Sequence, residues 1–566
     1  PLPFVPLNEI FNVTANDTIE AHPDLFPIIT PIKAGVLRRL LIEHPNQPFV
    51  QSVCRGYEEG FWPWADTSIV PLPTTLDVKN QFCEAEHVDF VRSQRDIEIE
   101  HNCFSKGFPH LLPGMMVVPI VVSTKARSGK LRMCVNHSAE PFARNMMIPK
   151  SVVSVPLDNL HDLGCVLREL RVLFGHDIGL NVWKCDAART HRNQPMDPHW
   201  QIKQIVKIDN RYHVDRASNF GSRASGGLWG SFCSLVLWIA RHRNIRDVFA
   251  YADDCFSVEL ATSMSYYIPY NKLMPTSQCR FLELFDELGI PHEEKKQVFG
   301  EELMVIGFVV NCRSMSITMP ADSRCDLISA IRAFAVPGRR PKLSDYQRLA
   351  GWINWSLNVF PLLRPGLSAL YAKIKGKNQQ YREIYVNKQV CGELLWVANH
   401  MESLPGIFMV DSVDWSLAHA DLTILCDASP LAMGFWIPSL FLGFQSAFQN
   451  DGSLPIFFWE ALSVLSALTW AVERSFPPPR RLLIFTDNSN TVSMFNSLRA
   501  TSTYNPILLT ACDLLIKYST SLRVCHISGK DNDIADALSR LENDRALAAC
   551  PTLSINQFLP PRLMMG

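Results

Sequence analysis

The chain has 566 residues, more than a single hydrophobic core supports, and this length predicts roughly three or four domains. Its composition, 47% hydrophobic and 19% charged, excludes an intrinsically disordered protein and is typical of a globular one. The formal net charge of −1 excludes a global attraction for nucleic acid, so any such binding must use local basic surfaces.

The N-terminal region, residues 1–110, is predicted to be mostly helical, with proline-rich turns and no residues that indicate a chemistry. Its start lacks the basic and apolar segments of a secretion signal, and the missing initiator methionine suggests a fragment or a processed product. The sixteen cysteines form no CxxC pair, which predicts reduced thiols in an intracellular protein, cytoplasmic or nuclear. Four possible zinc ligands match no common finger spacing, and we interpret them as helix-surface and core residues: Cys83, His87, His101 and Cys103.

Residues 111–315 are predicted to form a mixed sheet with helices on one face. The expected elements are a hairpin over 115–138, a helix over 157–173, a strand over 181–186, a hairpin over 200–214, a helix over 228–240, the strand-like VFAYADDCFSVEL, and a helix and strand over 281–310. The apolar stretch 228–240 is too short to cross a bilayer, so we expect no membrane span.

The remaining chain predicts a helical segment, a second α/β unit and a tail. Residues 316–410 are expected to be helical, 411–545 to form the α/β unit, and 546–566 to be a C-terminal tail. The α/β unit should contain the strands TILCDAS, RLLIFTD and RVCHIS and the helices WEALSVLSALTWAV, NTVSMFNSL and 507–517. The predicted fold class is therefore multidomain, α/β and α+β.

A first group of carboxylates combines Asp253 and Asp254 of a YADD motif with Asp186 at the end of a strand. The apolar runs on both sides of YADD predict a tight turn between two buried strands. Nucleotidyl transfer needs carboxylates from separate strands that hold two metal ions about 4 Å apart, which this set could supply. The alternative is an ordinary turn with Asp186 as a strand-end cap.

The order of the motifs KLRMCV, WKCD, FGSRASG, YADD, GIPHEEKK and LMVIGFVV resembles that of reverse transcriptases. The resemblance implies a right-hand polymerase, with fingers and palm in 111–315 and thumb and connection in 316–410. It implies that Arg132 contacts the incoming triphosphate, and that Lys295 or Lys296 protonates the leaving pyrophosphate. It also implies nucleotide or template contacts for Tyr251, Phe220 and Gly221. The alternative for the cationic residues is an ordinary solvated surface.

Two positions depart from the reverse transcriptase pattern. His191 occupies the place of the aromatic residue that blocks a ribose 2′-hydroxyl, and its polar ring puts strict selection of deoxynucleotides in doubt. Gly226 replaces a usual proline, which predicts a looser turn. These departures leave open an inactive or decayed copy.

A second group of acids lies in the C-terminal α/β unit, where Asp427, Glu460, Asp487 and Asp536 come from four separate elements. Acids that meet at one sheet edge can hold two Mg²⁺ ions for phosphodiester hydrolysis. The segments CDAS, WEAL, FTDNSNT and HISGKDNDIADALSR resemble retroelement ribonuclease H. That resemblance implies a proton shuttle at His526 and an orienting amide at Asn532. The alternative is a degraded domain that only positions the hybrid.

The favoured hypothesis is a retrotransposon reverse transcriptase, DIRS-type or gypsy-type, fused to a ribonuclease H. Each site would use two Mg²⁺ ions, or Mn²⁺, and the partners would be an RNA template, a DNA primer, their hybrid and deoxynucleoside triphosphates. Candidate backbone contacts are Arg339, Arg340, Lys342, Arg348, Lys373, Lys375 and Lys377. The alternative is a domesticated or decayed relative that binds nucleic acid as a scaffold. A telomerase or intron-type polymerase is disfavoured because those enzymes do not carry this nuclease.

Overall fold

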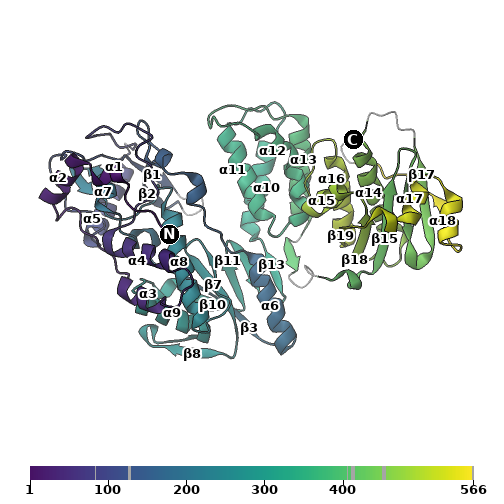
Figure 1. The fold of residues 1–566 in the computed structure, drawn as a ribbon, viewed down its shortest axis with the longest axis horizontal. Coiled ribbons are helices and arrows are strands. Elements are labelled where there is room, and N and C mark those ends of the chain that lie inside the picture. The colour runs from purple at the N-terminus through teal and green to yellow at the C-terminus, as the bar shows by residue number, and fades with distance from the viewer. Residues whose placement is uncertain (83, 125–128, 405, 410–414, 449–453, 564–566) are drawn as a thin grey trace. The chain divides into compact units, whose positions relative to one another are not determined.

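The structure is a computed structural model that describes residues 1–82, 84–124, 129–404, 406–409, 415–448 and 454–563. It divides the chain into two compact units, each of which is described by itself (Figure 1). Unit 1 comprises residues 1–306 and 310–314, and unit 2 comprises residues 307–309 and 315–566. Both units contain helices and sheets, which confirms the mixed α/β multidomain class.

Helices dominate the start of unit 1, as the sequence predicts. They are α1 (Leu7–Ile10), α2 (Val13–Ala21), α3 (Ala34–Leu40), α4 (Gln47–Glu59) and α5 (Ala85–Glu100). The α4 helix shows why: the side chain of Asn46 caps its N-terminus by accepting a hydrogen bond from the amide of Phe49, and Gly60, at φ 96°, follows its last residue. Its buried residues recur at helical spacing and join the core beside the buried Phe61 and Trp62.

The central sheet of unit 1 has the strand order β10-β3-β7-β6. Its strands are β3 (Leu180–Asp186), β6 (Phe249–Tyr251), β7 (Asp254–Leu260) and β10 (Val298–Gly300), and its main helices are α6 (Leu160–Phe174), α8 (Ser225–His242) and α9 (Thr276–Leu288). Trp183, Cys185 and Cys255 of the sheet share one core with buried residues of α8 and α9. The helices and strands predicted for 157–186 and 228–260 are therefore confirmed.

Shorter elements complete unit 1. They are β1 (Ile120–Thr124), β2 (Leu131–Val135), α7 (Pro198–Gln201), β4 (Ile205–Ile208), β5 (Arg211–Val214), β8 (Met264–Tyr267), β9 (Lys272–Pro275) and β11 (Glu302–Val305). The β1–β2 and β4–β5 hairpins match the prediction, although residues 125–128 lie outside the described residues. The β8–β9 hairpin is not predicted from the sequence, because its strands are short and the segment between them, with Pro269 and Asn271, indicates only a turn.

The first part of unit 2 is helical, as predicted for 316–410. It contains β12 (Phe308–Asn311) at the division between the units, β13 (Ser316–Thr318), α10 (Ala321–Phe334), α11 (Leu343–Ser356), the 3-10 helix η6 (Pro361–Leu367), α12 (Ser368–Ile374), α13 (Lys388–Ser403) and β14 (Ile407–Met409). The strands β13 and β14 pair antiparallel. The Trp396 indole N–H lies 2.9 Å from an Asp513 carboxylate oxygen, and His400 Nε2 lies 2.6 Å from the same atom, so α13 is joined to the α/β part.

The α/β part of unit 2 is built on a six-stranded sheet of order β19-β18-β15-β16-β17-β20. Its strands are β15 (Leu422–Ala428), β16 (Ala432–Ile437), β17 (Leu442–Ala447), β18 (Arg481–Thr486), β19 (Ser521–His526) and β20 (Ser554–Gln557). Its helices are α14 (Ile456–Arg474), α15 (Ser489–Ser497), α16 (Asn505–Tyr518), α17 (Asp533–Ser539) and α18 (Asn543–Ala549). The predicted tail 546–566 therefore contributes an edge strand, since β20 pairs parallel to β17.

The α14 helix has the length and composition of a membrane span, but 67% of its apolar 18-residue stretch is buried inside the protein. Its buried face packs in the core of the six-stranded sheet, together with Ile424 and Phe435. A helix that is apolar around most of its circumference is expected at the centre of a domain. Its position therefore accounts for its hydropathy without a membrane.

A buried histidine gives unit 1 a predicted pH dependence. His137 is fully buried, neither ring nitrogen has a hydrogen-bond partner among the described residues, and burial lowers its pKa to about 3. Below its ordinary pKa of 6.5, the unfolded chain therefore binds a proton that the folded chain does not. The free energy of unfolding should fall on acidification from pH 7 towards pH 5, by up to about 1.4 kcal/mol per pH unit from this residue.

The measurement is the free energy of unfolding in urea at several pH values, followed by a signal from unit 1. His137→Leu should make the pH dependence shallower, whereas the exposed His110→Leu should leave it unchanged. Equal slopes in the wild type and His137→Leu would show that the ring does not control acid stability.

Candidate active sites

The first acid group lies on two neighbouring strands of unit 1. The antiparallel pairing of β3 and β7 puts Asp186 directly opposite Asp254, and the tight turn between β6 and β7 carries Asp253. Ala252 in this turn adopts a left-handed conformation, φ 56°, and its carbonyl accepts a 2.8 Å hydrogen bond from the indole of Trp229. The predicted turn thus brings acids from separate strands together.

Two lysines form ion pairs with this group. Lys184 Nζ lies 2.8 Å from Asp254 Oδ2, and Lys296 Nζ lies 2.9 Å from Asp186 Oδ1. Burial raises the pKa of Asp254, and the charges of Asp253 and Asp186 add to this effect while Lys184 opposes it. Burial alone would lower the pKa of Lys296, but the pair with Asp186 raises it, so this ammonium stays protonated. The lysines therefore offset the repulsion among the carboxylates.

The structure separates the two lysines that the sequence left as alternatives. The Lys295 side chain is 79% exposed and pairs with Glu293, whereas Lys296 contacts Asp186. The next residue, Gln297, is buried, and its amide exchanges two hydrogen bonds with the backbone of Asp186, at 3.2 and 3.0 Å. Sequence reasoning missed Gln297 and Lys184, because neither stands out among ordinary polar residues.

Phe220 and Gly221 form a tight contact with the β1–β2 hairpin. The Phe220 carbonyl accepts a 3.0 Å hydrogen bond from the amide of Val135. Gly221 has φ +130°, and a Cβ at this position would lie 1.9 Å from the Val135 carbonyl oxygen, so only glycine fits. Gly226, in contrast, lies in the first turn of α8 rather than in a loop, and a Cβ there would meet open space.

The Phe220 ring gathers two of the predicted nucleotide contacts. The guanidinium of Arg132 lies 4.8 Å from its centroid, and the ring of His191 packs edge-on at 5.2 Å. Burial lowers the pKa of His191, although the charge of Asp253 opposes the shift. The His191 imidazole therefore packs on Phe220 and lies close enough to Asp253 to be affected by its charge. Tyr251 pairs with Asp254 across the β6–β7 strands.

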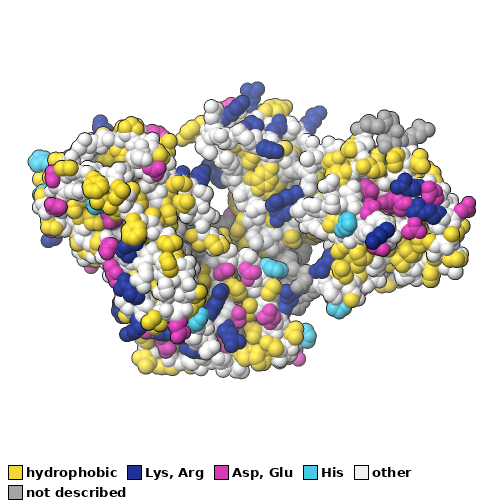
Figure 2. All heavy atoms as spheres, in the orientation of Figure 1, with side chains coloured by type: hydrophobic (Ala, Val, Ile, Leu, Met, Phe, Trp, Pro, Cys, Tyr) yellow, Lys and Arg dark blue, Asp and Glu magenta, His cyan; other side chains and the backbone are white. Residues whose placement is uncertain are grey.

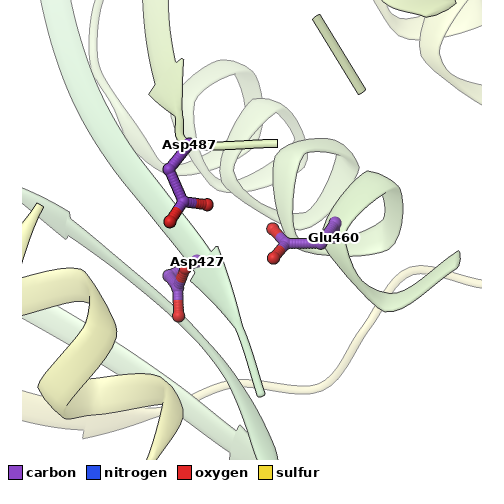
Figure 3. Close-up of side chains that lie close together, drawn as sticks. All are labelled: Asp427, Glu460 and Asp487. Carbon is purple, nitrogen blue, oxygen red and sulfur yellow. The ribbon is translucent and has the colours of Figure 1, made fainter. Parts of the chain in front are cut away.

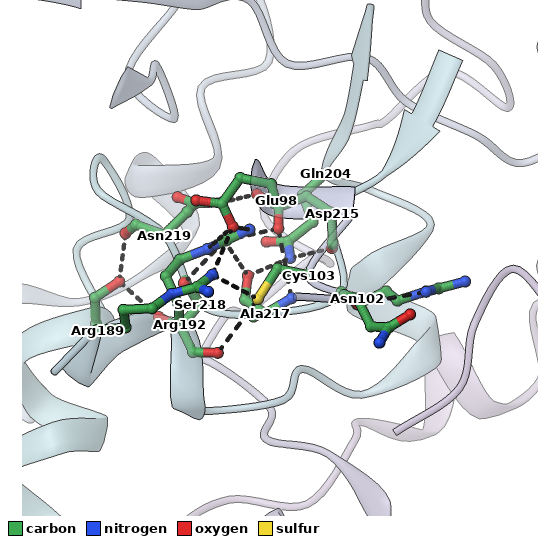
Figure 4. Close-up of polar contacts among 12 residues, drawn as sticks. Glu98, Asn102, Cys103, Arg189, Arg192, Gln204, Asp215, Ala217, Ser218 and Asn219 are labelled. Atoms are coloured by element: carbon green, nitrogen blue, oxygen red, sulfur yellow. Dashed lines mark hydrogen bonds and ion pairs between the residues drawn. The ribbon is translucent and has the colours of Figure 1, made fainter. Parts of the chain in front are cut away.

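A buried ionic network connects the N-terminal region to the segment that follows Asp186 (Figure 4). Arg192 donates to Glu98 of α5 at 3.0 Å and to Asp215 at 2.8 Å, while Arg189 lies 3.1 Å from the same Glu98 carboxylate. Asn219 donates to Asp215 at 3.0 Å and directly precedes Phe220. The network thus joins α5, the segment of His191 and the segment of Phe220, and no sequence signal distinguished Glu98 from its neighbours.

Loss of one charge in this network should destabilise unit 1. Glu98→Gln would leave Arg192 with one acid instead of two in a buried position, and removing one partner of a buried ion pair costs about 3–5 kcal/mol. Hydrogen exchange of the amides in 187–194 and 215–221 measures the effect locally, and we expect faster exchange. Glu100→Gln, an exposed change on the same helix, is the matched control. Unchanged exchange in Glu98→Gln would mean that the network does not hold these segments.

The zinc candidates are placed as follows. Cys83 lies outside the described residues, and His87 pairs with Glu84 at 3.4 Å. Cys103 is buried, and its thiol lies 3.4 Å from Arg189 at the edge of the network. His101 donates a local hydrogen bond from Nδ1 to the carbonyl of Ile97, at 2.9 Å. Each described member of the set therefore has a local role, and the described cysteines are free thiols.

The second acid group lies at one edge of the six-stranded sheet (Figure 3). The parallel pairing of β15 and β18 ends at Cys426 and Thr486, so the next residues, Asp427 and Asp487, emerge side by side. Glu460 reaches the same point from the first part of α14. The carboxylate oxygens of Asp427, Glu460 and Asp487 lie within 4.8 Å of one another, and Asp487 is the most accessible of the three.

Burial and mutual repulsion disturb the titration of these acids. Burial raises the pKa of Asp427 to about 6 and that of Glu460 to about 9, and neighbouring acids contribute to both shifts. Ser539 Oγ lies 2.6 Å from Asp427 Oδ2 and opposes the shift of Asp427. Glu460 Oε2 is buried without a hydrogen-bond partner among the described residues. The group is therefore short of positive charge.

The fourth predicted acid, Asp536, has two cationic partners. Arg540 lies 2.8 Å and Arg545 2.7 Å from its carboxylate oxygens. Burial alone would raise the pKa of Asp536, but hydrogen bonds from the two arginines lower it. Figure 2 shows acidic and basic side chains gathered over α17 and α18, where these pairs lie. Asp536 is thus close enough to raise the pKa of Asp427, but it lies outside the group of three.

The remaining residues implied by the nuclease resemblance lie near the same edge. His526 is exposed at the end of β19, where it pairs with Thr486, the residue before Asp487. Asn532 is buried, and its amide donates a 2.9 Å hydrogen bond to the carbonyl of Cys426, the residue before Asp427. His526 is therefore accessible to solvent beside the acids, while Asn532 supports the strand that carries Asp427.

The donor sets of both groups fit divalent cations to different degrees. In unit 2, three carboxylates within 4.8 Å and the unpartnered Glu460 oxygen match the hard oxygen ligands that Mg²⁺ prefers. In unit 1, Asp186, Asp253 and Asp254 offer the same ligand type, but their oxygens do not all lie within 4.8 Å of one another, and two of the acids are ion-paired with lysines. The seven basic candidates of 339–377 all lie in the helical part of unit 2.

Comparisons with known proteins return structures but no family. No family model and no curated protein matches the chain. Solved structures similar to it include the foamy viral protease-reverse transcriptase dRH with ds DNA, at 14% identity over 89% of this chain and 83% of that chain. The same enzyme with RNA/DNA hybrid is similar at 12% identity over 87% and 62%, and with dsDNA at 13% identity over 89% and 99%. Each TM-score is 0.43, so residue roles must come from the geometry above.

Proposed function

We propose that this chain is a retrotransposon reverse transcriptase with a fused ribonuclease H. The observation that carries the proposal is that one chain assembles two separate carboxylate groups, each from elements distant in the sequence. Residues 111–315 would form fingers and palm, 316–410 thumb and connection, and 411–545 the nuclease. The partners would be RNA template, DNA primer, RNA/DNA hybrid and deoxynucleoside triphosphates, in an intracellular setting.

In unit 1, Asp186, Asp253 and Asp254 would hold the divalent ions, and nearby residues would orient the nucleotide. The protonated Lys296 would place positive charge beside the triphosphate when its pair with Asp186 opens. Arg132 would contact the phosphates while its guanidinium is steadied on Phe220. His191, packed on the same ring, would stand against the sugar. A neutral, bulky ring at this place disfavours a 2′-hydroxyl by its volume.

In unit 2, Asp427, Glu460 and Asp487 would hold ions, with Asp536 completing the set. Bound Mg²⁺ would lower the pKa of the attacking water and offset charge on the scissile phosphate, and Mn²⁺ could replace it. Ser539 orients Asp427 by its hydrogen bond, and Asn532 supports the preceding carbonyl. The exposed His526 would move a proton at the leaving oxygen through its ring nitrogens. These roles agree with hydrolysis of the RNA strand of a hybrid.

A change in unit 1 should remove polymerisation alone. Asp254→Asn is expected to lower deoxynucleotide incorporation on an RNA template at least about 100-fold, because losing one charge-stabilising group costs on the order of 10²–10³ in kcat. Cleavage of the RNA strand of a hybrid should stay within about twofold of the wild type. Primer extension and hybrid cleavage are measured with Mg²⁺, and the exposed Asp177→Asn is the control. If wild type incorporates no more than Asp254→Asn while it still binds hybrid, the polymerase assignment fails and a binding scaffold is favoured.

A change in unit 2 should have the reverse effect. Asp427→Asn is expected to lower cleavage of the RNA strand by about 100-fold or more for the same reason, while DNA synthesis remains measurable. The exposed Asp544→Asn, a change of the same type in the same domain, should cleave like the wild type. Hybrid cleavage that survives Asp427→Asn would exclude this acid group as the nuclease centre.

A further inference from the structure

Unit 2 contains a cavity of about 400 Å³ that neither acid group uses. It lies where α11, η6 and α12 of the helical part meet the segment after α15 of the α/β part. Its lining includes Asn354, Arg364, Tyr371, Leu498 and Arg499. We call this the arginine pocket.

The walls of the arginine pocket are held together by hydrogen bonds. Ser368 Oγ donates to the carbonyl of Ala500 at 2.8 Å, which joins α12 to the segment after α15. Asn505, fully buried, donates from its amide to the carbonyl of Pro365 and to Glu393, both at 3.0 Å. Glu393 in turn accepts a 2.6 Å hydrogen bond from the amide of Ala369. The pocket is therefore preformed, and a ligand would not have to order it.

The charge in the pocket is uncompensated. Arg364 is half-buried and Arg499 is exposed; neither has an ion pair or hydrogen bond to any residue that the structure describes, and no acid lines the pocket. Burial lowers the pKa of Arg364, and the charge of Arg499 lowers it further. Elsewhere in unit 2 arginines have acidic partners, such as Arg332 with Glu402 and Arg545 with Glu542. Two neighbouring guanidinium groups without an acid can bind an anion through charge-assisted hydrogen bonds.

The geometry points to a phosphate site: we propose that the arginine pocket binds a phosphodiester group of the nucleic acid backbone. Guanidinium groups match phosphate oxygens with paired donors, and the polar side chains of Asn354 and Tyr371 can add further donors. Leu367 and Leu498 also line the pocket, and their side chains offer the guanidinium groups no acceptor. This inference rests on the proposed function, since it assumes that unit 2 holds a nucleic acid strand.

The distance to the nuclease acids suits a strand that contacts both places. Asp487 lies two residues before the first residue of α15, and Arg499 lies two residues after its last. The nine residues of α15 span roughly 14 Å at 1.5 Å per residue. A backbone phosphate a few nucleotides from the cleaved bond could therefore reach the pocket. The pocket would thus set the register of the hybrid over Asp427, Glu460 and Asp487 without reading its sequence.

The test measures binding of a labelled RNA/DNA hybrid to the full chain without divalent ions. Fluorescence anisotropy gives the affinity at a series of salt concentrations. R364Q/R499Q should bind about tenfold or more weakly, and the slope of log affinity against log salt should shrink by about two, one for each lost phosphate contact. R332Q/R474Q removes the same charge from exposed positions outside the pocket and should bind as the wild type. Thermal unfolding of R364Q/R499Q should be unchanged or shifted upward, because the variant loses a repulsive pair.

The outcomes separate this inference from the proposed function. Wild-type binding and salt slope in R364Q/R499Q would overturn the pocket while the proposed function stands. Failure of the wild type to bind hybrid at all would overturn both. A third arm adds inorganic phosphate or a deoxynucleoside triphosphate. If either stabilises the wild type but not R364Q/R499Q, and hybrid binding is equal in both, the site takes a free phosphate and the backbone assignment is wrong.

Discussion

The structure depends on a single electrostatic constraint: carboxylates that repel one another are held on neighbouring strands. Two strand pairings impose this arrangement. Antiparallel β3 and β7 put Asp186 opposite Asp254. The parallel pairing of β15 and β18 ends just before Asp427 and Asp487, so these two residues lie at the same edge. Backbone hydrogen bonds and buried cores maintain these registers, so the acids cannot move apart without opening a sheet. The surrounding residues can be understood by how they offset the repulsion.

The two units offset it differently. In unit 1, Lys184 and Lys296 contribute positive charge directly. In unit 2, Asp427 has a hydroxyl partner, and the raised pKa values of Asp427 and Glu460 arise first from burial and then from repulsion by the neighbouring acids. Arg540 and Arg545 serve the neighbouring Asp536 instead. The first site is therefore closer to charge balance than the second, which has the greater need of a cation.

Asp186, Asp427 and Asp487 could be predicted from the sequence because each lies at or just after the end of a strongly apolar strand. YADD joins the strands β6 and β7, and CDAS and FTDN lie at the ends of strands whose apolar runs are continuous. The residues that support the acids could not be found in this way. Gln297, Glu98 and Ser539 are polar residues without a pattern, and their partners are 94 to 112 residues away in the chain. Likewise β16, β17 and β20 were missed, since Gly434 and Gly443 weaken the strand signal and β20 is only four residues long.

The N-terminal region shows how far such long-range contacts extend the candidate site. Residues 1–110 carry no recognisable chemistry, yet Glu98 is one of two acids that neutralise Arg192. Asp215, the other, has its pKa raised by burial to about 6, in opposition to the pull of Arg192. Without Glu98, Asp215 alone would neutralise the fully buried guanidinium of Arg192, and its raised pKa favours its protonated form. The chain between Asp186 and His191 would then be held less firmly. The placement of His191 and Phe220 beside the acids is therefore a property of the whole of unit 1, and α5 belongs to the structure that builds the site.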